Sequence, residues 1–147
     1  MEKMNIYFCG SIRGGRQLAA TYEKIIRLLG EYGRVLTEHL GDDDQISRKD
    51  SLMSDREIHD RDLEWILESD LVVAEVTVPS LGVGYEIGRA IENRKPILCL
   101  FREGTKKRLS AMIAGSPGVE VCPYTDPADL SDTFRQFVTR NAHGRIF

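Results

Sequence analysis

The sequence lacks several features that mark specialised classes of protein. It has three cysteines, Cys9, Cys99 and Cys122, and no pair of them has the spacing of a metal site. An odd number of thiols beside apolar runs indicates reduced cysteines in the core rather than a disulfide framework. No apolar run approaches the roughly 20 residues that cross a bilayer, and the N-terminus shows no signal-peptide pattern. These absences predict an intracellular protein, cytoplasmic or nuclear, with no membrane association.

The sequence also has no large excess of charge of one sign. The net charge is −3, from 20 basic and 23 acidic residues, so a polymeric nucleic acid is not an expected partner. No His/Cys/Asp cluster has the spacing of a metal site, and we expect neither a metal nor a cofactor. The length suits one domain over residues 1–147, with enough chain to bury a sizeable core.

Apolar runs of strand length alternate with segments of helical periodicity. We predict strands at 5–9, 34–37, 71–76, 97–101 and 119–122, and helices at 16–32, 55–68, 82–93, 106–114 and 127–141. Gly33 is predicted to end the first helix. This alternation indicates an α/β fold: a doubly wound, five-stranded parallel sheet of order 2-1-3-4-5, similar to flavodoxin or Rossmann folds.

Two Ser/Gly-rich turns follow the first and third predicted strands, at residues 10–15 and 80–84. In the expected strand order these strands are neighbours, so the turns should meet over one pocket. Neither turn has the spacing of a Walker A loop or a dinucleotide fingerprint. Backbone N–H groups with Ser11 and Arg13 suit a phosphomonoester, and an ordinary Gly-rich turn is the alternative.

Glu86 follows the second turn and lies one turn into the next helix. A carboxylate beside an anion-binding helix N-terminus is unfavourable unless it takes part in chemistry, so Glu86 is a candidate nucleophile. Asp62 belongs to an acidic run on the helix 55–68, most of which should form a solvated face, although one acid can point to the pocket. His39 ends the second strand and can reach the pocket mouth, but a lone histidine is more often structural.

Taken together, these motifs resemble the 2′-deoxynucleoside 5′-phosphate N-hydrolases of the nucleoside 2-deoxyribosyltransferase superfamily. The resemblance runs in order from about residue 5 to residue 113. The motifs that carry it are Tyr7-Phe-Cys-Gly-Ser-Ile-Arg-Gly-Gly15, Leu36-Thr-Glu-His39, Asp62-Leu-Glu-Trp65, Val73-Ala-Glu-Val-Thr77, Pro79-Ser-Leu-Gly-Val-Gly-Tyr-Glu86, Lys95-Pro-Ile-Leu-Cys-Leu-Phe101 and Leu109-Ser-Ala-Met-Ile113.

The resemblance implies hydrolysis of the N-glycosidic bond of a 2′-deoxynucleoside 5′-monophosphate to free base and 2-deoxyribose 5-phosphate. It implies a covalent intermediate on Glu86, Asp62 as general acid, and Tyr7 as the residue that positions the nucleophile. It also implies a homodimer in which the partner's 110–112 segment completes the phosphate site. The substrate-binding residues that we expect on this basis are Gly10, Ser11, Ile12, Arg13, Gly14, Gly15, Arg16, His39, Ser80, Gly82, Glu86, Ser110, Ala111 and Met112.

Elementary glycoside chemistry agrees with this assignment. Two carboxylates around an oxocarbenium-like transition state can attack the anomeric carbon and protonate the leaving group. As the acid, Asp62 has to be protonated near neutral pH, and burial against Trp65 or proximity to Glu86 can achieve that. The alternatives are a 2-deoxyribosyltransferase and a non-catalytic nucleotide-binding module. Intact Tyr7, Asp62 and Glu86 argue against the module.

Overall fold

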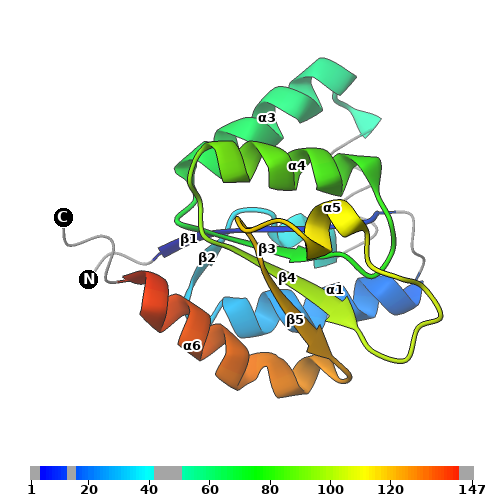
Figure 1. Ribbon diagram of the computed structural model, residues 1–147. Coiled ribbons are helices and arrows are strands. Elements are labelled where there is room, and N and C mark those ends of the chain that lie inside the picture. Colours follow the sequence, from blue (N-terminus) through cyan, green and yellow to red (C-terminus); the bar gives the residue numbers. More distant parts are fainter. Residues whose placement is uncertain (1–3, 13–15, 42–50, 143–147) are drawn as a thin grey trace.

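Five parallel strands form the centre of the protein, in the order β2-β1-β3-β4-β5 (Figure 1). The computed structural model describes residues 4–12, 16–41 and 51–142, without the side chains of Arg16 and Gln17. This confirms the predicted fold class and strand order. The strands are β1 (Met4–Gly10), β2 (Gly33–Val35), β3 (Leu71–Glu75), β4 (Ile97–Arg102) and β5 (Glu120–Tyr124).

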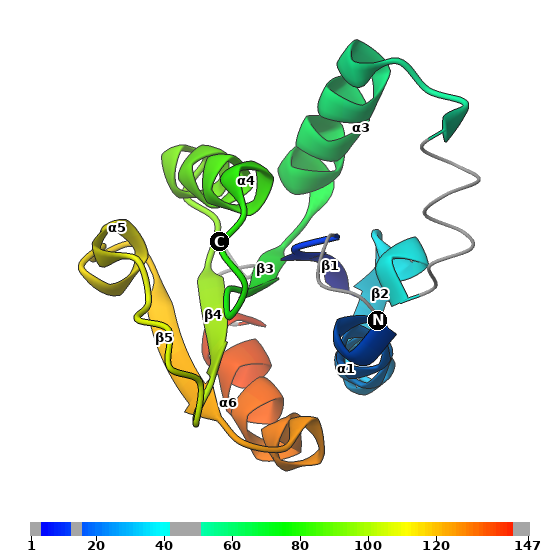
Figure 2. The ribbon, with the colours of Figure 1, turned by 90° about the vertical axis from the view of Figure 1, so that its right-hand side faces the viewer.

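Helices cover both faces of this sheet, as Figure 2 shows from the side. On one face lie α1 (Arg16–Leu29) and α6 (Ser131–Ala142), and on the other lie α3 (Asp55–Glu68) and α4 (Leu81–Glu92). The short elements are η1 (Glu38–Gly41), α5 (Ala111–Ala114) and η2 (Pro127–Leu130). Within the described ranges, no helix combines the length and apolarity needed to cross a membrane.

Alternate residues of the central strands point to opposite faces of the sheet, as the two-residue period of a strand requires. Ile6 and Phe8 of β1 join the core on the α1 and α6 side. Tyr7 and Cys9 join the core on the α3 and α4 side. The register of β1 therefore presents Tyr7 and Cys9 to the helices that carry Asp62 and Glu86.

Most predicted bounds differ from the observed ones by one or two residues, and the largest differences concern three helices. The first helix ends at Leu29, and Gly33 does not end it but begins β2, where a Cβ atom would clash with the carbonyl oxygen of Met4. The helix predicted for 106–114 is only α5, because Ser110 caps it and accepts from the Met112 N–H at 3.3 Å. Three consecutive cations at 106–108 would oppose the dipole of a longer helix at its N-terminus. The helix predicted for 127–141 begins instead as the 3-10 turn η2.

Glu75 is a buried carboxylate at the end of β3, only 1% exposed. Its Oε1 accepts from the Thr77 N–H at 2.7 Å, and its Oε2 accepts from the Tyr124 hydroxyl at 2.9 Å. Thr77 Oγ1 in turn accepts from the Arg102 N–H at 2.8 Å. These bonds tie the ends of β3, β4 and β5 together where the chain turns into α4.

Replacing Glu75 with alanine should lower the free energy of unfolding by about 2–4 kcal/mol, because two buried donors lose their acceptor. Urea denaturation at pH 7 measures this loss. Glu75→Gln keeps one acceptor and should lose less. The matched control is Glu92→Ala at the exposed end of α4, which should change the unfolding free energy by no more than about 0.5 kcal/mol. Equal midpoints for Glu75→Ala and the control would contradict the structural role of this network.

Candidate active site

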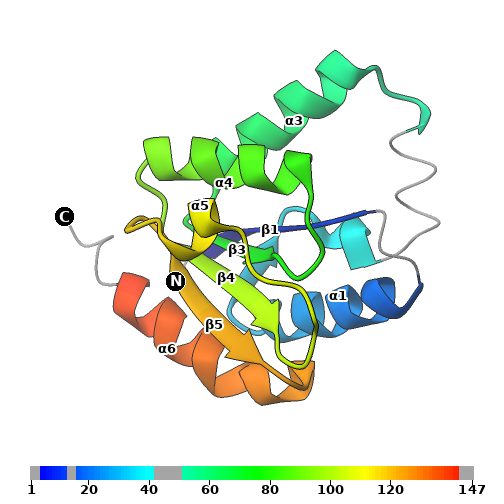
Figure 3. The same ribbon diagram turned by 45° about the vertical axis from the view of Figure 1, so that its right-hand side comes forward.

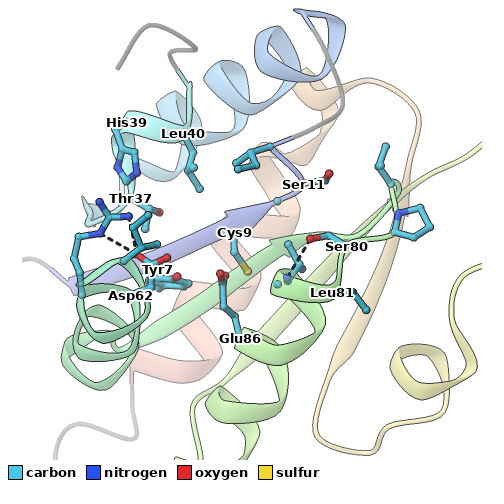
Figure 4. Close-up of a pocket in the computed structure, with 18 residues that line it drawn as sticks. Tyr7, Cys9, Ser11, Thr37, His39, Leu40, Asp62, Ser80, Leu81 and Glu86 are labelled. Atoms are coloured by element: carbon cyan, nitrogen blue, oxygen red, sulfur yellow. Dashed lines mark hydrogen bonds and ion pairs between the residues drawn. The ribbon is translucent and has the colours of Figure 1, made fainter. Parts of the chain in front are cut away.

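A cavity of about 530 Å³ lies at the carboxyl ends of β1 and β3 (Figure 4). Residues 10–12 of the first Ser/Gly turn and residues 80–83 of the second line it together, so the predicted meeting of the turns is confirmed for their described residues. The cavity takes walls from the end of β1, from η1, from α3, and from the β3–α4 turn with the first half of α4. The predicted site residues that line it are Tyr7, Gly10, Ser11, Ile12, His39, Asp62, Ser80, Gly82 and Glu86.

Local capping positions the two carboxylates on their helices. Ser54 begins α3 with a capping box, in which its hydroxyl accepts from the Glu57 N–H at 3.1 Å. Ser80 begins α4 and accepts from the Val83 N–H at 3.3 Å. Asp62 is the eighth residue of α3 and Glu86 is the sixth residue of α4, and both side chains line the same cavity. The helix starts therefore fix which residues point into the cavity.

Four predicted site residues cannot be compared with the cavity. Arg13, Gly14 and Gly15 fall outside the described residues, as does the side chain of Arg16.

Ser110, Ala111 and Met112 line a second cavity of about 860 Å³. It is lined by α4, α5 and the β3–α4 turn. Figure 3 shows α5 beside α4. In a single chain, the 110–112 segment and Glu86 line different cavities.

The carboxylate of Glu86 lies beside Tyr7 and Cys9 (Figure 4). Both side chains hydrogen-bond with Glu86, which favours its ionised form. Its other oxygen, Oε2, is buried and has no hydrogen-bond partner among the residues that the structure describes. The sequence interpretation assigned Cys9 only to the core. Its two-residue spacing from Tyr7 on β1 was the signal that both reach the same side chain.

Burial raises the pKa of Glu86 to about 7, and the nearby charge of Asp62 acts in the same direction. Hydrogen bonds from Cys9 and Tyr7 and the charge of Arg61 oppose this shift. Burial, and then the charge of Glu86, holds the pKa of the Tyr7 hydroxyl far above its ordinary range, so Tyr7 remains a neutral donor. Glu86 is thus close to half ionised near neutral pH, in the range that suits a carboxylate in catalysis.

The raised pKa of Glu86 has a consequence for stability. The group binds its proton more tightly in the folded state, so folding stability should fall as the pH rises from about 4.5 to about 7. Glu86→Gln cannot ionise and should be more stable than the wild type at pH 8, by about 2–3 kcal/mol. Thermal and urea unfolding at pH 4.5 and pH 8 measure the difference. Glu92→Gln, on the exposed end of α4, should show no such pH-dependent gain, and an equal gain there would contradict the assignment.

Asp62 forms an ion pair with Arg61, a residue that the sequence interpretation did not select for the site. Nε and Nη2 of Arg61 each lie 3.0 Å from Oδ1 of Asp62. The guanidinium also stacks on Trp65, 4.8 Å from the ring centroid, and Trp65 packs against His39 with the ring centroids 5.8 Å apart. Burial against Trp65 or proximity to Glu86 was expected to protonate Asp62, and the guanidinium in contact with both Asp62 and Trp65 acts in the opposite direction. The sequence signals for Arg61 were its adjacency to Asp62 and its four-residue spacing from Trp65 on the predicted helix 55–68.

A family model for nucleoside 2-deoxyribosyltransferase matches residues 6–122, from β1 into β5. The chain belongs to this family. The predicted resemblance is confirmed, and the match includes Tyr7, Asp62 and Glu86. Residues 4–12, 16–41 and 51–142 contain no group of three His, Cys, Asp or Glu side chains that could hold a metal ion.

Several relatives are similar over most of the chain. A 5-hydroxymethyl-dUMP N-hydrolase of Danio rerio is 57% identical over 143 residues, covering 94% of this chain and all of that protein. The Homo sapiens 5-hydroxymethyl-dUMP N-hydrolase is 54% identical over 112 residues, covering 76% of this chain and 64% of that protein. A solved Clostridium botulinum CMP N-glycosidase has the same fold, with a TM-score of 0.66 at 24% identity, covering 90% of this chain and 98% of that one.

Proposed function

We propose that the protein hydrolyses the N-glycosidic bond of 2′-deoxynucleoside 5′-monophosphates and releases the free base and 2-deoxyribose 5-phosphate. The observation that carries this proposal is the pair of carboxylates, Asp62 and Glu86, in one cavity beside two Ser/Gly turns suited to an anion. The names of the Danio rerio and Homo sapiens relatives support the reaction and the monophosphate substrate.

The first step is attack of the ionised Glu86 on the anomeric carbon. A C1′–O bond forms, the C1′–N bond breaks, and its electron pair leaves with the base, which takes a proton from Asp62. Tyr7 holds the attacking carboxylate by hydrogen bonding. In the second step, Asp62 accepts a proton from a water molecule that attacks C1′, and Glu86 is released.

The phosphate is proposed to lie at the opposite end of the cavity from the base. Ser80 and Gly82 at the start of α4 offer a hydroxyl and free N–H groups, and Ser11 lines the same cavity from β1. Gly10 and Ile12, together with residues 13–16, complete the first turn in this proposal. His39 is assigned to the base and sugar, because it packs on Trp65 beside Asp62. Phosphate binding then provides remote binding energy that holds the sugar over Glu86.

We further propose a homodimer in which Ser110, with Ala111 and Met112, reaches the partner's phosphate site. Leu81 and Met112 are 96% and 81% exposed, and both line the cavity beside α5. A second copy that covers this apolar surface would remove it from water. Sedimentation velocity distinguishes the cases: a monomer at micromolar concentration would refute the shared site.

An intracellular location, in the cytoplasm or nucleus, is the proposal that fits three free cysteines and a nucleotide substrate. Fractionation of cells that express a tagged chain tests it. Recovery of the chain only from the medium would contradict it.

A panel of deoxynucleoside 5′-monophosphates, with base release followed by chromatography, tests the activity. Each monophosphate is paired with its free nucleoside, and we expect the monophosphate to react much faster because the nucleoside lacks the phosphate contacts. Equal rates would overturn the substrate class.

A second free base is added in a parallel reaction. The family name makes 2-deoxyribosyl transfer the alternative, and a new nucleotide product would support it. Binding of the monophosphates with no base release would instead indicate a non-catalytic module.

A further inference from the structure

Arg61 is fixed in place against Asp62 by several contacts. Its side chain is 16% exposed, and Nε and Nη2 share the Oδ1 atom of Asp62 at 3.0 Å. Nη1 lies 3.3 Å from the sulfur of Met53, and the guanidinium stacks on Trp65 at 4.8 Å. Such an ion pair, largely shielded from water and with a planar support, favours one charge state of its acid more strongly than an exposed pair does.

Within residues 4–12, 16–41 and 51–142, charged and titratable groups near Asp62 come from four elements. From α3, Arg61 supplies the positive charge in contact with it. From α4, Glu86 supplies a second acid. From β1, Tyr7 and Cys9 interact electrostatically with Asp62. Both remain neutral, because burial raises the pKa of both groups. From η1, His39 lines the same cavity.

These groups give the two carboxylates, Asp62 and Glu86, different electrostatic environments. Asp62 is in contact with a guanidinium, whereas Glu86 is buried and its Oε2 has no hydrogen-bond partner among the described residues. Two facing carboxylates near neutral pH tend to share one proton, because both cannot ionise freely at short range. The environment of each acid then decides which of them holds it.

We propose that Arg61 is a positioning residue that keeps Asp62 ionised in the empty site and so leaves the shared proton on Glu86. This inference rests on the proposed function, in which the productive arrangement is the opposite one: Asp62 protonated and Glu86 ionised. Substrate binding therefore has to draw Arg61 away from Asp62 and let the proton move from Glu86 to Asp62. A carbonyl oxygen on the base is an acceptor that can take the guanidinium N–H groups.

The pH dependence of kcat/KM tests this role in three proteins: wild type, Arg61→Gln and the charge-conserving control Arg61→Lys. In the wild type, activity should fall above about pH 7, as Glu86 ionises and the last proton leaves the pair. Without the cation both acids hold a proton more tightly. Arg61→Gln should therefore move this alkaline limb upward by about one pH unit. Arg61→Lys should leave the alkaline limb near its wild-type position.

An alkaline limb that stays in place in Arg61→Gln would overturn the proposal, since loss of a purely structural contact lowers activity without moving the limb.

A second measurement does not depend on activity or on the folding of any variant at Arg61. Carboxyl ¹³C NMR of the free wild-type protein, with Asp62→Asn and Glu86→Gln to assign the signals, follows the two acids separately. At pH 6 we expect Asp62 to be ionised and Glu86 to be largely protonated. The reverse order would refute the role of Arg61. If no deoxynucleotide is cleaved but the expected order is found, the proposed function fails and the charge assignment to Arg61 stands.

Discussion

Glu86→Gln should reduce the release of base from a deoxynucleoside monophosphate by at least about 10³-fold, because an uncharged amide cannot form the glycosyl-enzyme bond. Single-turnover reactions with enzyme in excess, analysed by chromatography, measure the chemical step directly. Substrate binding should persist, since the side chain keeps nearly the same volume and the phosphate subsite is formed by other residues.

Two controls separate a loss of chemistry in Glu86→Gln from a loss of folded protein. The variant is expected to be more stable than the wild type at pH 8, so a loss of activity there cannot result from unfolding. Glu92→Gln changes an exposed glutamate at the end of the same helix and should retain full activity. Turnover of Glu86→Gln within tenfold of the wild type would remove Glu86 as the nucleophile.

Asp62→Asn should lower kcat by about 10²–10⁴-fold, the usual contribution of a positioned acid or base. The effect should depend on the leaving group. A base that departs readily as an anion needs little protonation and should lose less than a base that must be protonated. A series of deoxyuridine monophosphates with electron-withdrawing substituents at carbon 5 measures this dependence in both proteins.

The matched control is Asp60→Asn. Asp60 lies two residues away on α3, is exposed, and contacts His59 and Arg56 at 2.9 and 3.6 Å instead of the cavity. Its replacement should leave kcat unchanged. If Asp62→Asn loses nothing with any leaving group, another side chain supplies the proton, and His39 becomes the first candidate because it lines the same cavity.

Most of the fold could be predicted because it depends on patterns that are local in sequence. The alternation of apolar strands with helical periodicity was sufficient for the order β2-β1-β3-β4-β5, and α3 has the predicted bounds of 55–68. The errors in the predicted helix boundaries have a different origin. The 106–114 segment has helix-forming residues throughout, but a run of three cations and the cap at Ser110 limit the helix to α5. The end of α1 was missed because Gly33 is required for close approach of β2 to β1, a contact between strands.

The same distinction applies to the site: the sequence determined some of its features, and the tertiary structure determined the others. By itself the sequence determined which residue types are present, that Tyr7 precedes a Ser/Gly turn, and that Glu86 follows another by one helical turn. Only the tertiary structure decided what surrounds the two acids. Packing of α4 over β1 buries Glu86 and raises its pKa to about 7, and the fold of α3 places Arg61 between Asp62 and Trp65. Arg61, Asp62 and Trp65 are neighbours within α3, but the pKa of Glu86 depends on burial and on partners from β1 and α3, and no local spacing along the chain contains that information.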